Sequence, residues 1–181
     1  IQWLRDELEL INSAEETEKI ALSIDDTKGV YIIPAFVGLG APYWNSDCKG
    51  TITGLTRGSN KKHIIRASLE AIAFQVEDLL KCISNDIKSP IKKLHVDGGA
   101  TNNKFLMQFQ SDISNLKILK PRNIESTSIG VAAMAGLKCK VFNNINEIIE
   151  HKTIDLIYQP KITERQRNQK IKGWKEAIKK I

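Results

Sequence analysis

The sequence predicts an α/β fold that is helix-rich around a short-stranded sheet. Short apolar segments bounded by glycine or proline alternate with longer segments in which apolar residues recur every three or four positions. This alternation is typical of a sheet covered by helices. With 181 residues, 41% of them hydrophobic, the chain can bury one substantial core, as one domain or as one domain with a small appendage.

The first segment predicts a helix that ends near Asn12. Ile1, Leu4, Leu8 and Ile11 fall on one face of such a helix. The sequence has no initiator Met, and no Ser, Thr, Asp or Asn precedes the helix as a cap. We therefore expect this sequence to be part of a longer protein, in which upstream residues carry half of any site.

Two short strands separated by an apolar loop are expected next. Val30–Ile33 predicts a strand that Pro34 stops, and Thr51–Leu55 alternates polar and apolar residues as a second strand would. The loop Phe36–Trp44 between them is apolar despite its glycines and proline. Because loops are normally polar, we expect this one to be covered by the rest of the protein or to line a cleft.

The longest helix is predicted over residues 61–84, with Asn60 as its N-cap. Apolar residues recur along it at helical spacing. Opposite charges four positions apart predict two ion pairs along it, Arg66 with Glu70 and Glu77 with Lys81.

A short buried strand, Lys93–Val96, is expected to run into the pair Gly98 and Gly99. Asn102 and Asn103 are suited to cap the helix that follows, whose apolar stripe begins at Phe105. Glycines at such a turn can adopt positive φ, and without a Cβ they let a ligand press on the backbone. The helix start offers unpaired N–H groups and partial positive charge, which suits a phosphate.

This strand–Gly-Gly–helix turn predicts a nucleotide site, with a plain tight connection as the alternative. The dinucleotide fingerprint G-x-G-x-x-G is not present after the strand. Asp97, which precedes the glycines, could be mistaken for a general base. A carboxylate there would repel a triphosphate, so we expect it to stabilise the turn through an Asx-type bond.

The next elements are a strand, a helix and a short helix. Leu116–Leu119 predicts a strand broken by Pro121. Ser126–Lys138 is rich in Gly and Ala, which suits a helix packed tightly on a sheet, and the hydroxyl residues at its start are explained by capping (Ser126, Thr127, Ser128). Asn143–Glu150 predicts a short helix.

The last helix is predicted over residues 164–180, with Ile171, Trp174 and Ile178 on one face. Its other faces carry many basic side chains without interleaved aromatic residues (Arg165, Arg167, Lys170, Lys172, Lys175, Lys179, Lys180). We interpret these as a solvated face, with nucleic-acid binding as the less favoured alternative.

Composition and charge exclude several classes of protein. The sequence has no apolar run long enough to span a membrane and no secretory signal pattern. Three cysteines without a C-x-x-C motif argue against a disulfide scaffold or a zinc site, and they favour the cytoplasm. The net charge of +6 accompanies abundant Lys, Asn and Ile, so we interpret the charge as compositional.

The residues alone identify neither a metal site nor a catalytic residue. His63, His95 and His151 lie on different elements, and no pair of them has metal-ligand spacing. We expect His63 to have a surface role and His95 to be packed or partly exposed. No Ser/His/Asp or Cys/His constellation can be assembled from the remaining residues.

Seven blocks of sequence resemble the FGGY carbohydrate kinases, and among them the glycerol kinases. The blocks lie in order along nearly the whole chain (Ile1–Asp6, Pro34–Trp44, Gly54–Gly58, His63–Glu70, Val96–Ala100, Phe105–Asp112 and Gly173–Lys175). Residues 50–70 also fit the C-terminal signature of the broader family. The resemblance implies the C-terminal part of an actin/hexokinase-like (ribonuclease H-like) ATPase fold.

The resemblance further implies ATP-dependent phosphorylation of glycerol to glycerol 3-phosphate in the cytoplasm, with Mg²⁺. Residues 1–181 would form a partial C-terminal nucleotide-binding domain, and the substrate domain, with the catalytic aspartate and the phosphate-binding threonines, would lie upstream. Glycerol and ATP are the implied small-molecule partners, with no nucleic acid and no membrane span. The full-length protein would be a homo-oligomer.

By matching motifs, Gln2, Gly99 and Asn103 are the positions that the resemblance assigns to the adenine nucleotide. Lys104 departs from the pattern, because the family often has a second Asn there. The segment after Pro160 also departs from the pattern in which some members bind a sugar-transport regulator, so no such partner is implied. The alternatives are another FGGY sugar kinase, acting on a pentulose or gluconate, and a non-catalytic nucleotide-binding fragment.

Overall fold

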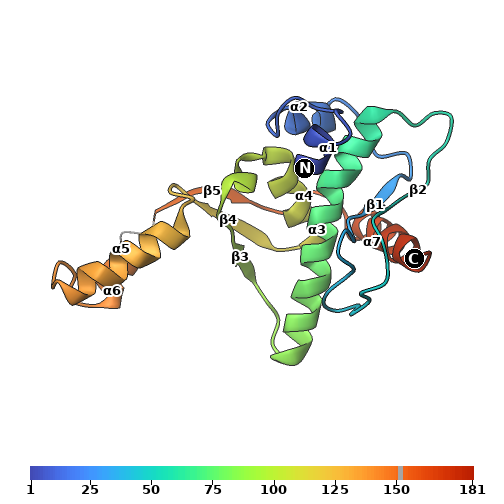
Figure 1. The fold of residues 1–181 in the computed structure, drawn as a ribbon. Coiled ribbons are helices and arrows are strands. Elements are labelled where there is room, and N and C mark those ends of the chain that lie inside the picture. The colour runs from blue at the N-terminus through green and yellow to red at the C-terminus, as the bar shows by residue number, and fades with distance from the viewer. Residues whose placement is uncertain (151–152) are drawn as a thin grey trace.

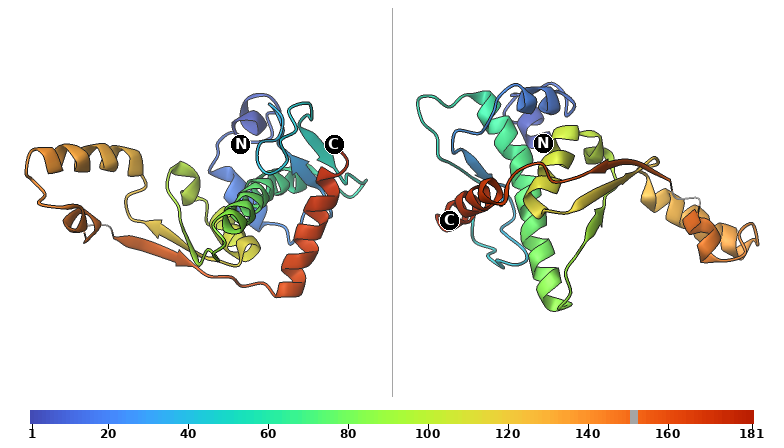
Figure 2. Two further views of the ribbon diagram at one scale, coloured as in Figure 1. Left: turned by 90° about the horizontal axis from the view of Figure 1, so that it is seen from below. Right: turned by 180° about the vertical axis from the view of Figure 1, so that it is seen from behind.

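The computed structural model describes residues 1–150 and 153–181. A main body surrounds one long helix, and a helical arm extends from one side of it (Figures 1 and 2). In chain order the elements are α1 (Gln2–Asp6), α2 (Glu16–Leu22), β1 (Tyr31–Ile33), β2 (Thr51–Thr53), α3 (Lys61–Asp86), β3 (Lys93–His95), the 3₁₀ helix η1 (Gly99–Asn102), α4 (Lys104–Ser114), β4 (Lys117–Pro121), α5 (Ser126–Lys138), α6 (Ile145–Glu150), β5 (Ile154–Tyr158) and α7 (Glu164–Ile178).

Helix α3 begins at a closed N-cap, as the sequence predicts. The Asn60 side chain accepts a hydrogen bond from the Lys62 N–H at 3.0 Å, and the ring of His63 accepts one from the Asn60 N–H at 3.1 Å. His63 is 3% exposed, so the expected surface role is wrong, because its ring completes the cap. The helix continues two residues past Ser84, to Asp86.

The core lies on both sides of α3. On one side, β1 pairs antiparallel with β2, with Ile32 opposite Ile52, and helix α7 covers them (Figure 1). The ring of Trp174 from α7 stacks on that of Phe74 from α3 at a centroid distance of 5.2 Å. A Cβ at Gly173 would collide with the Tyr31 ring, so this glycine lets α7 approach β1 closely.

Asp78 on α3 joins this side of the core to the preceding loop. Its Oδ2 accepts hydrogen bonds from the Trp174 indole N–H and from the Tyr43 hydroxyl, each at 2.6 Å. Burial, and then the Asp78 carboxylate, raise the pKa of the Tyr43 hydroxyl. One carboxylate oxygen therefore connects three segments that are distant in sequence.

On the other side of α3, the three-stranded sheet has the order β3-β4-β5. Strands β3 and β4 are parallel and are linked through η1 and α4, whereas β5 pairs antiparallel with β4. Helix α4 packs between this sheet and α3, where Ile113 and Ile118 are fully buried. The predicted α/β class is confirmed, with helices more extensive than strands.

The first half of the chain differs from its prediction in three places. The first helix ends at Asp6, and Leu8 is exposed because Glu9 adopts a positive φ of 49° that turns the chain. Helix α2 was not expected, because it is polar over most of its length. In the loop after β1, Leu39 is buried but Phe36, Val37 and Trp44 are exposed, so the loop is only partly covered.

In the second half, strand β3 is not buried, since Lys93 and His95 are exposed and Leu94 is only partly covered. Strand β4 ends at Pro121, where the register also shifts, so the predicted break at this proline is confirmed. There are three smaller differences from the prediction. Strand β5 was not expected, helix α6 starts at Ile145 instead of Asn143, and helix α7 ends at Ile178 instead of Lys180.

The arm differs most from its prediction. Helix α5 has the predicted bounds, yet none of its residues, all of which the structure describes, is buried. Met134 is 74% exposed, and α5 projects from the body with α6 (Figures 1 and 2). The expected tight packing on a sheet is therefore wrong in this structure. His151 lies outside the described residues, and no described helix is long and apolar enough to cross a membrane.

Replacing Trp174 by Phe tests the junction around Asp78. Trp174→Phe keeps an aromatic ring on Phe74 but removes the N–H that Asp78 accepts, so we expect a loss of about 2–3 kcal/mol in unfolding free energy by urea titration. The matched change Trp44→Phe, at a residue that is 79% exposed, should shift it by less than about 0.5 kcal/mol. Equal losses in the two variants would contradict this account.

Candidate nucleotide site

The candidate site lies at the carboxyl ends of the parallel strands β3 and β4. In open α/β sheets, ligands bind at this edge, where loops leave neighbouring strands. The Gly98 N–H donates to the Ile124 carbonyl at 2.9 Å, so the turn after β3 is bonded to the connection between β4 and α5. Gly98 has a φ of 80°, a conformation that favours glycine.

Thr101 stabilises the turn itself. Its N–H and its hydroxyl both donate to the Gly98 carbonyl, at 3.1 and 2.7 Å, which shapes residues 99–102 into one turn of 3₁₀ helix. Thr101 is buried, whereas Asp97 is exposed. The turn is thus stabilised by the Thr101 hydroxyl, which the sequence pattern did not single out.

The backbone at Gly99 is open to a ligand. Apart from Gly99 itself, its two chain neighbours and the backbone of its own helical turn, no heavy atom of the described residues lies within 4 Å of the position that a Cβ on Gly99 would occupy. Unlike Gly98, this residue does not have a positive φ. Neither conformation nor crowding inside the chain therefore requires glycine at position 99, and its bare surface is available to a molecule placed against it.

Asn103 caps helix α4, as the sequence predicts. Its Oδ1 accepts the Leu106 N–H at 2.9 Å, and its Nδ2 donates to the Thr17 hydroxyl at 3.0 Å. An amide group has two hydrogens and two lone pairs, so one of each remains for a ligand. Asn103 is half-buried and follows the open turn directly.

The start of α4 is not a phosphate site. The Lys104 N–H donates to the carboxylate of Glu18 on α2 at 2.6 Å, and the Leu106 N–H is held by Asn103. A negative side chain thus already occupies the positive end of the helix dipole. The expectation of unpaired N–H groups at this helix start is wrong for both residues.

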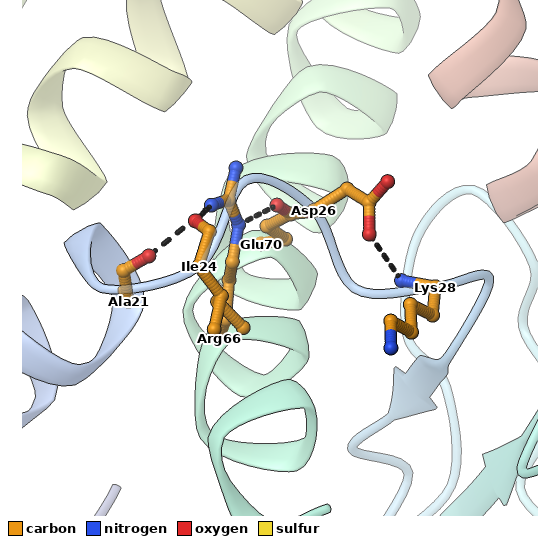
Figure 3. Close-up of polar contacts among 6 residues, drawn as sticks. All are labelled: Ala21, Ile24, Asp26, Lys28, Arg66 and Glu70. Atoms are coloured by element: carbon orange, nitrogen blue, oxygen red, sulfur yellow. Dashed lines mark hydrogen bonds and ion pairs between the residues drawn. The ribbon is translucent and has the colours of Figure 1, made fainter. Parts of the chain in front are cut away.

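Helix α2 is anchored by a buried arginine on α3 (Figure 3). The Arg66 guanidinium bonds Glu70 at 2.9 Å and also donates to the Ala21 carbonyl at 3.1 Å and to the Ile24 carbonyl. Burial raises the pKa of the Glu70 carboxyl, and Lys170 and Arg66 oppose that shift. The predicted pair is therefore confirmed and also holds the end of α2; the pair Glu77–Lys81 forms at 2.8 Å.

Gly99 and Asn103 are brought together in one turn, and Gln2 comes from a separate element. Gln2 is exposed on α1. Thr17, Glu18 and Thr101 support the turn but were missed by sequence reasoning. For Thr17 and Glu18 no local signal exists, because each lies 86 residues from the group it bonds.

A cavity of about 820 Å³ adjoins the site on the side of the arm. It lies between the β4–α5 connection and helices α5 and α6, and its lining includes Ile124, Ile129, Phe142 and Ile149. Ile124 thus belongs both to this cavity and to the bond with Gly98. Helix α5 begins at Ser126, and its N-cap residue is Glu125, which makes no side-chain cap; the expected capping by Ser126–Ser128 is therefore wrong.

Across residues 1–150 and 153–181, no cluster of three His, Cys, Asp or Glu side chains could hold a metal ion.

The chain is similar to carbohydrate kinases. Residues 1–139 match the C-terminal domain of the FGGY family of carbohydrate kinases. A glycerol kinase of Shewanella amazonensis is 50% identical over 180 residues, and one of Clostridium botulinum is 49% identical over 180 residues. Both alignments cover 99% of this chain but 36% of the relative, so the chain spans about a third of the length of these curated relatives.

Solved structures show the same fold. A crystal structure of Plasmodium falciparum glycerol kinase with ADP matches with a TM-score of 0.89 and 35% identity, over 99% of this chain and 36% of the other. A xylulose kinase from Lactobacillus acidophilus matches over 97% of this chain and 36% of the other, with a TM-score of 0.79. At 23% identity the latter likeness supports the fold alone.

Replacing Arg66 by Lys tests the anchor of α2. Arg66→Lys keeps the charge but loses the planar fork that serves Glu70 and the α2 carbonyls, so we expect a loss of about 2–3 kcal/mol in unfolding free energy. The matched change Arg5→Lys, in an exposed pair with Asp6, should leave the unfolding free energy unchanged. An unaltered urea midpoint in Arg66→Lys would contradict the anchoring role.

Proposed function

This chain belongs to the FGGY family of carbohydrate kinases, and from that premise we propose that it forms the nucleotide-binding part of an ATP:glycerol phosphotransferase. The observation that carries the proposal is the 50% identity, over 99% of the chain, with a glycerol kinase. The open backbone at Gly99 and the half-used amide of Asn103 support nucleotide binding at this edge of the sheet. Gln2 on α1 is the third nucleotide contact in this proposal.

In the proposed complex, ATP lies with its adenosine against the Gly98–Gly99 turn. Its phosphates point away from α4, because the Glu18 carboxylate already occupies that helix start and repels negative charge. Phosphoryl transfer requires the γ-phosphate in line with the acceptor oxygen, with Mg²⁺ offsetting charge. Mg²⁺ would be carried by the phosphates of ATP rather than by a cluster of side chains in this part of the chain.

The acceptor side of the reaction is assigned to the part of the protein outside these residues. Residues 1–181 are proposed as a partial C-terminal nucleotide-binding domain, and glycerol, with the group that deprotonates it, belongs to the upstream domain. Closure of two domains on ATP and glycerol would exclude water from the reaction. This division explains why the described residues assemble no catalytic constellation.

The setting of the reaction is also part of the proposal. We place it in the cytoplasm, which the three unpaired cysteines, all in the described residues, support. We further propose a homo-oligomer for the full-length protein. The exposed side chains of Phe36, Val37 and Trp44, all in the loop after β1, support this, because exposed apolar surface can mark contact regions.

Gly99→Val in the full-length protein tests the nucleotide site. The added side chain would fill the space in which the nucleotide lies, so we expect the KM for ATP to rise by about 100-fold, with the Kd for glycerol unchanged. Gly40→Val is the matched control, since Gly40 also has open space around it and lies in the loop after β1. Glycerol 3-phosphate formation provides the readout. The glycerol assignment would be refuted if the wild-type protein did not phosphorylate glycerol but phosphorylated a pentulose or gluconate.

Measurements on the 181-residue chain alone distinguish the proposed kinase from the alternative, a non-catalytic nucleotide-binding module. Because the phosphate and acceptor sites are proposed to lie elsewhere, we expect calorimetry with ATP to show weak or no binding, and we expect no turnover. Turnover by these residues alone would disprove the division of the site between two parts. Tight ATP binding without activity of the full-length protein would favour the binding module.

A further inference from the structure

The contact between Thr17 and Asn103 determines how the Asn103 amide is oriented. Thr17 is 1% exposed, and its hydroxyl hydrogen is donated to the Ala14 carbonyl at 2.6 Å. Its oxygen can therefore only accept from Asn103, which requires Nδ2 to face Thr17 at 3.0 Å. The opposite atom, Oδ1, is then directed at the Leu106 N–H.

Capping of α4 does not need this second contact. The cap uses only Oδ1, and Ser, Asp or Asn serve about equally well at an N-cap. Thr17 instead prevents rotation of the amide, so that its remaining hydrogen and lone pair keep one direction. Asn103 itself directly follows the open turn at Gly99.

Helix α2 is itself held in place from α3. The Arg66 guanidinium binds the carbonyls of Ala21 in α2 and of Ile24 just after it (Figure 3). The Glu18 carboxylate in the first turn of α2 binds the Lys104 N–H. Thr17 is therefore presented to Asn103 by an element that is fixed at both sides. A buried hydroxyl on such an element is suited to orienting a ligand contact.

We propose that Thr17 is a positioning residue for nucleotide binding, acting by orienting the amide of Asn103. This inference rests on the proposed function, because it takes Asn103 to contact the nucleotide. Thr17 itself does not touch the ligand. Its role is to reduce the number of amide orientations that must be lost when ATP or ADP binds.

The experiment compares Thr17→Val with Thr17→Ser in the full-length protein. Val matches the shape of Thr but removes the hydroxyl, whereas Ser keeps it. We expect Thr17→Val to raise the Kd for ADP and the KM for ATP by about tenfold, because that factor corresponds to the free energy of one hydrogen bond. The kcat and the KM for glycerol should stay within about twofold of the wild-type values. Thr17→Ser should restore both nucleotide constants to near the wild-type values.

A double-mutant cycle separates positioning from a loss of fold. Asn103→Ser keeps a capping oxygen but has no amide to orient, so adding Thr17→Val to it should change the Kd for ADP by less than about twofold. Additive effects would overturn the inference. It would also be overturned if Thr17→Val raised the KM values for ATP and glycerol equally, as a general loss of structure would.

Failure of the proposed function gives a different pattern. If the wild-type protein binds ADP but phosphorylates another acceptor, the glycerol assignment fails, and the ADP comparison between Val and Ser still decides the role of Thr17. If wild-type and Thr17→Val proteins bind ADP equally, only the positioning role fails. If the wild-type protein binds no ADP at all, both proposals are refuted.

Discussion

The buried ion pair between Arg66 and Glu70 is the interaction on which the arrangement of the site depends. Both side chains come from one helix, but the guanidinium also binds two carbonyls at the end of α2. Since a buried charge needs all of its partners, the end of α2 has one stable position on α3. Helix α2 in turn bonds the cap and the first N–H of α4. An arginine that is not among the proposed nucleotide contacts therefore controls where the glycine turn meets its helix.

The sequence predicted the parts of the fold that local patterns determine. Helix α3, its Asn60 cap and the pair at Arg66 all follow from residues within a few positions of one another, as does the cap at Asn103. Helix α2 has no comparable pattern, because its role is to present polar groups to distant residues. Strand β5 has none either, since antiparallel pairing with β4 is decided by register across the sheet.

The site was predicted in part for the same reason. A glycine pair after a strand can be recognised from the local sequence alone. The family resemblance adds the neighbouring Asn103 as a nucleotide contact. The phosphate interpretation of the α4 start failed because Glu18, 86 residues before Lys104, occupies the helix end. Charge at a helix terminus depends on tertiary structure, so spacing along the chain could not reveal it. What a ligand meets at this turn is thus set by side chains on α2 as much as by the turn.

The junction at Asp78 has a consequence for how the protein is made. Its partner Trp174 follows it by 96 residues, and the face of Phe74 that the indole covers belongs to the same helix as Asp78. On the ribosome, α3 emerges long before α7, so during that interval the Phe74 ring and the Asp78 carboxylate lack their partner Trp174, although Tyr43 is already available to Asp78. Closure of this half of the core must wait for synthesis of the last helix, which makes the nascent chain most vulnerable to aggregation while β3 to β5 are being translated.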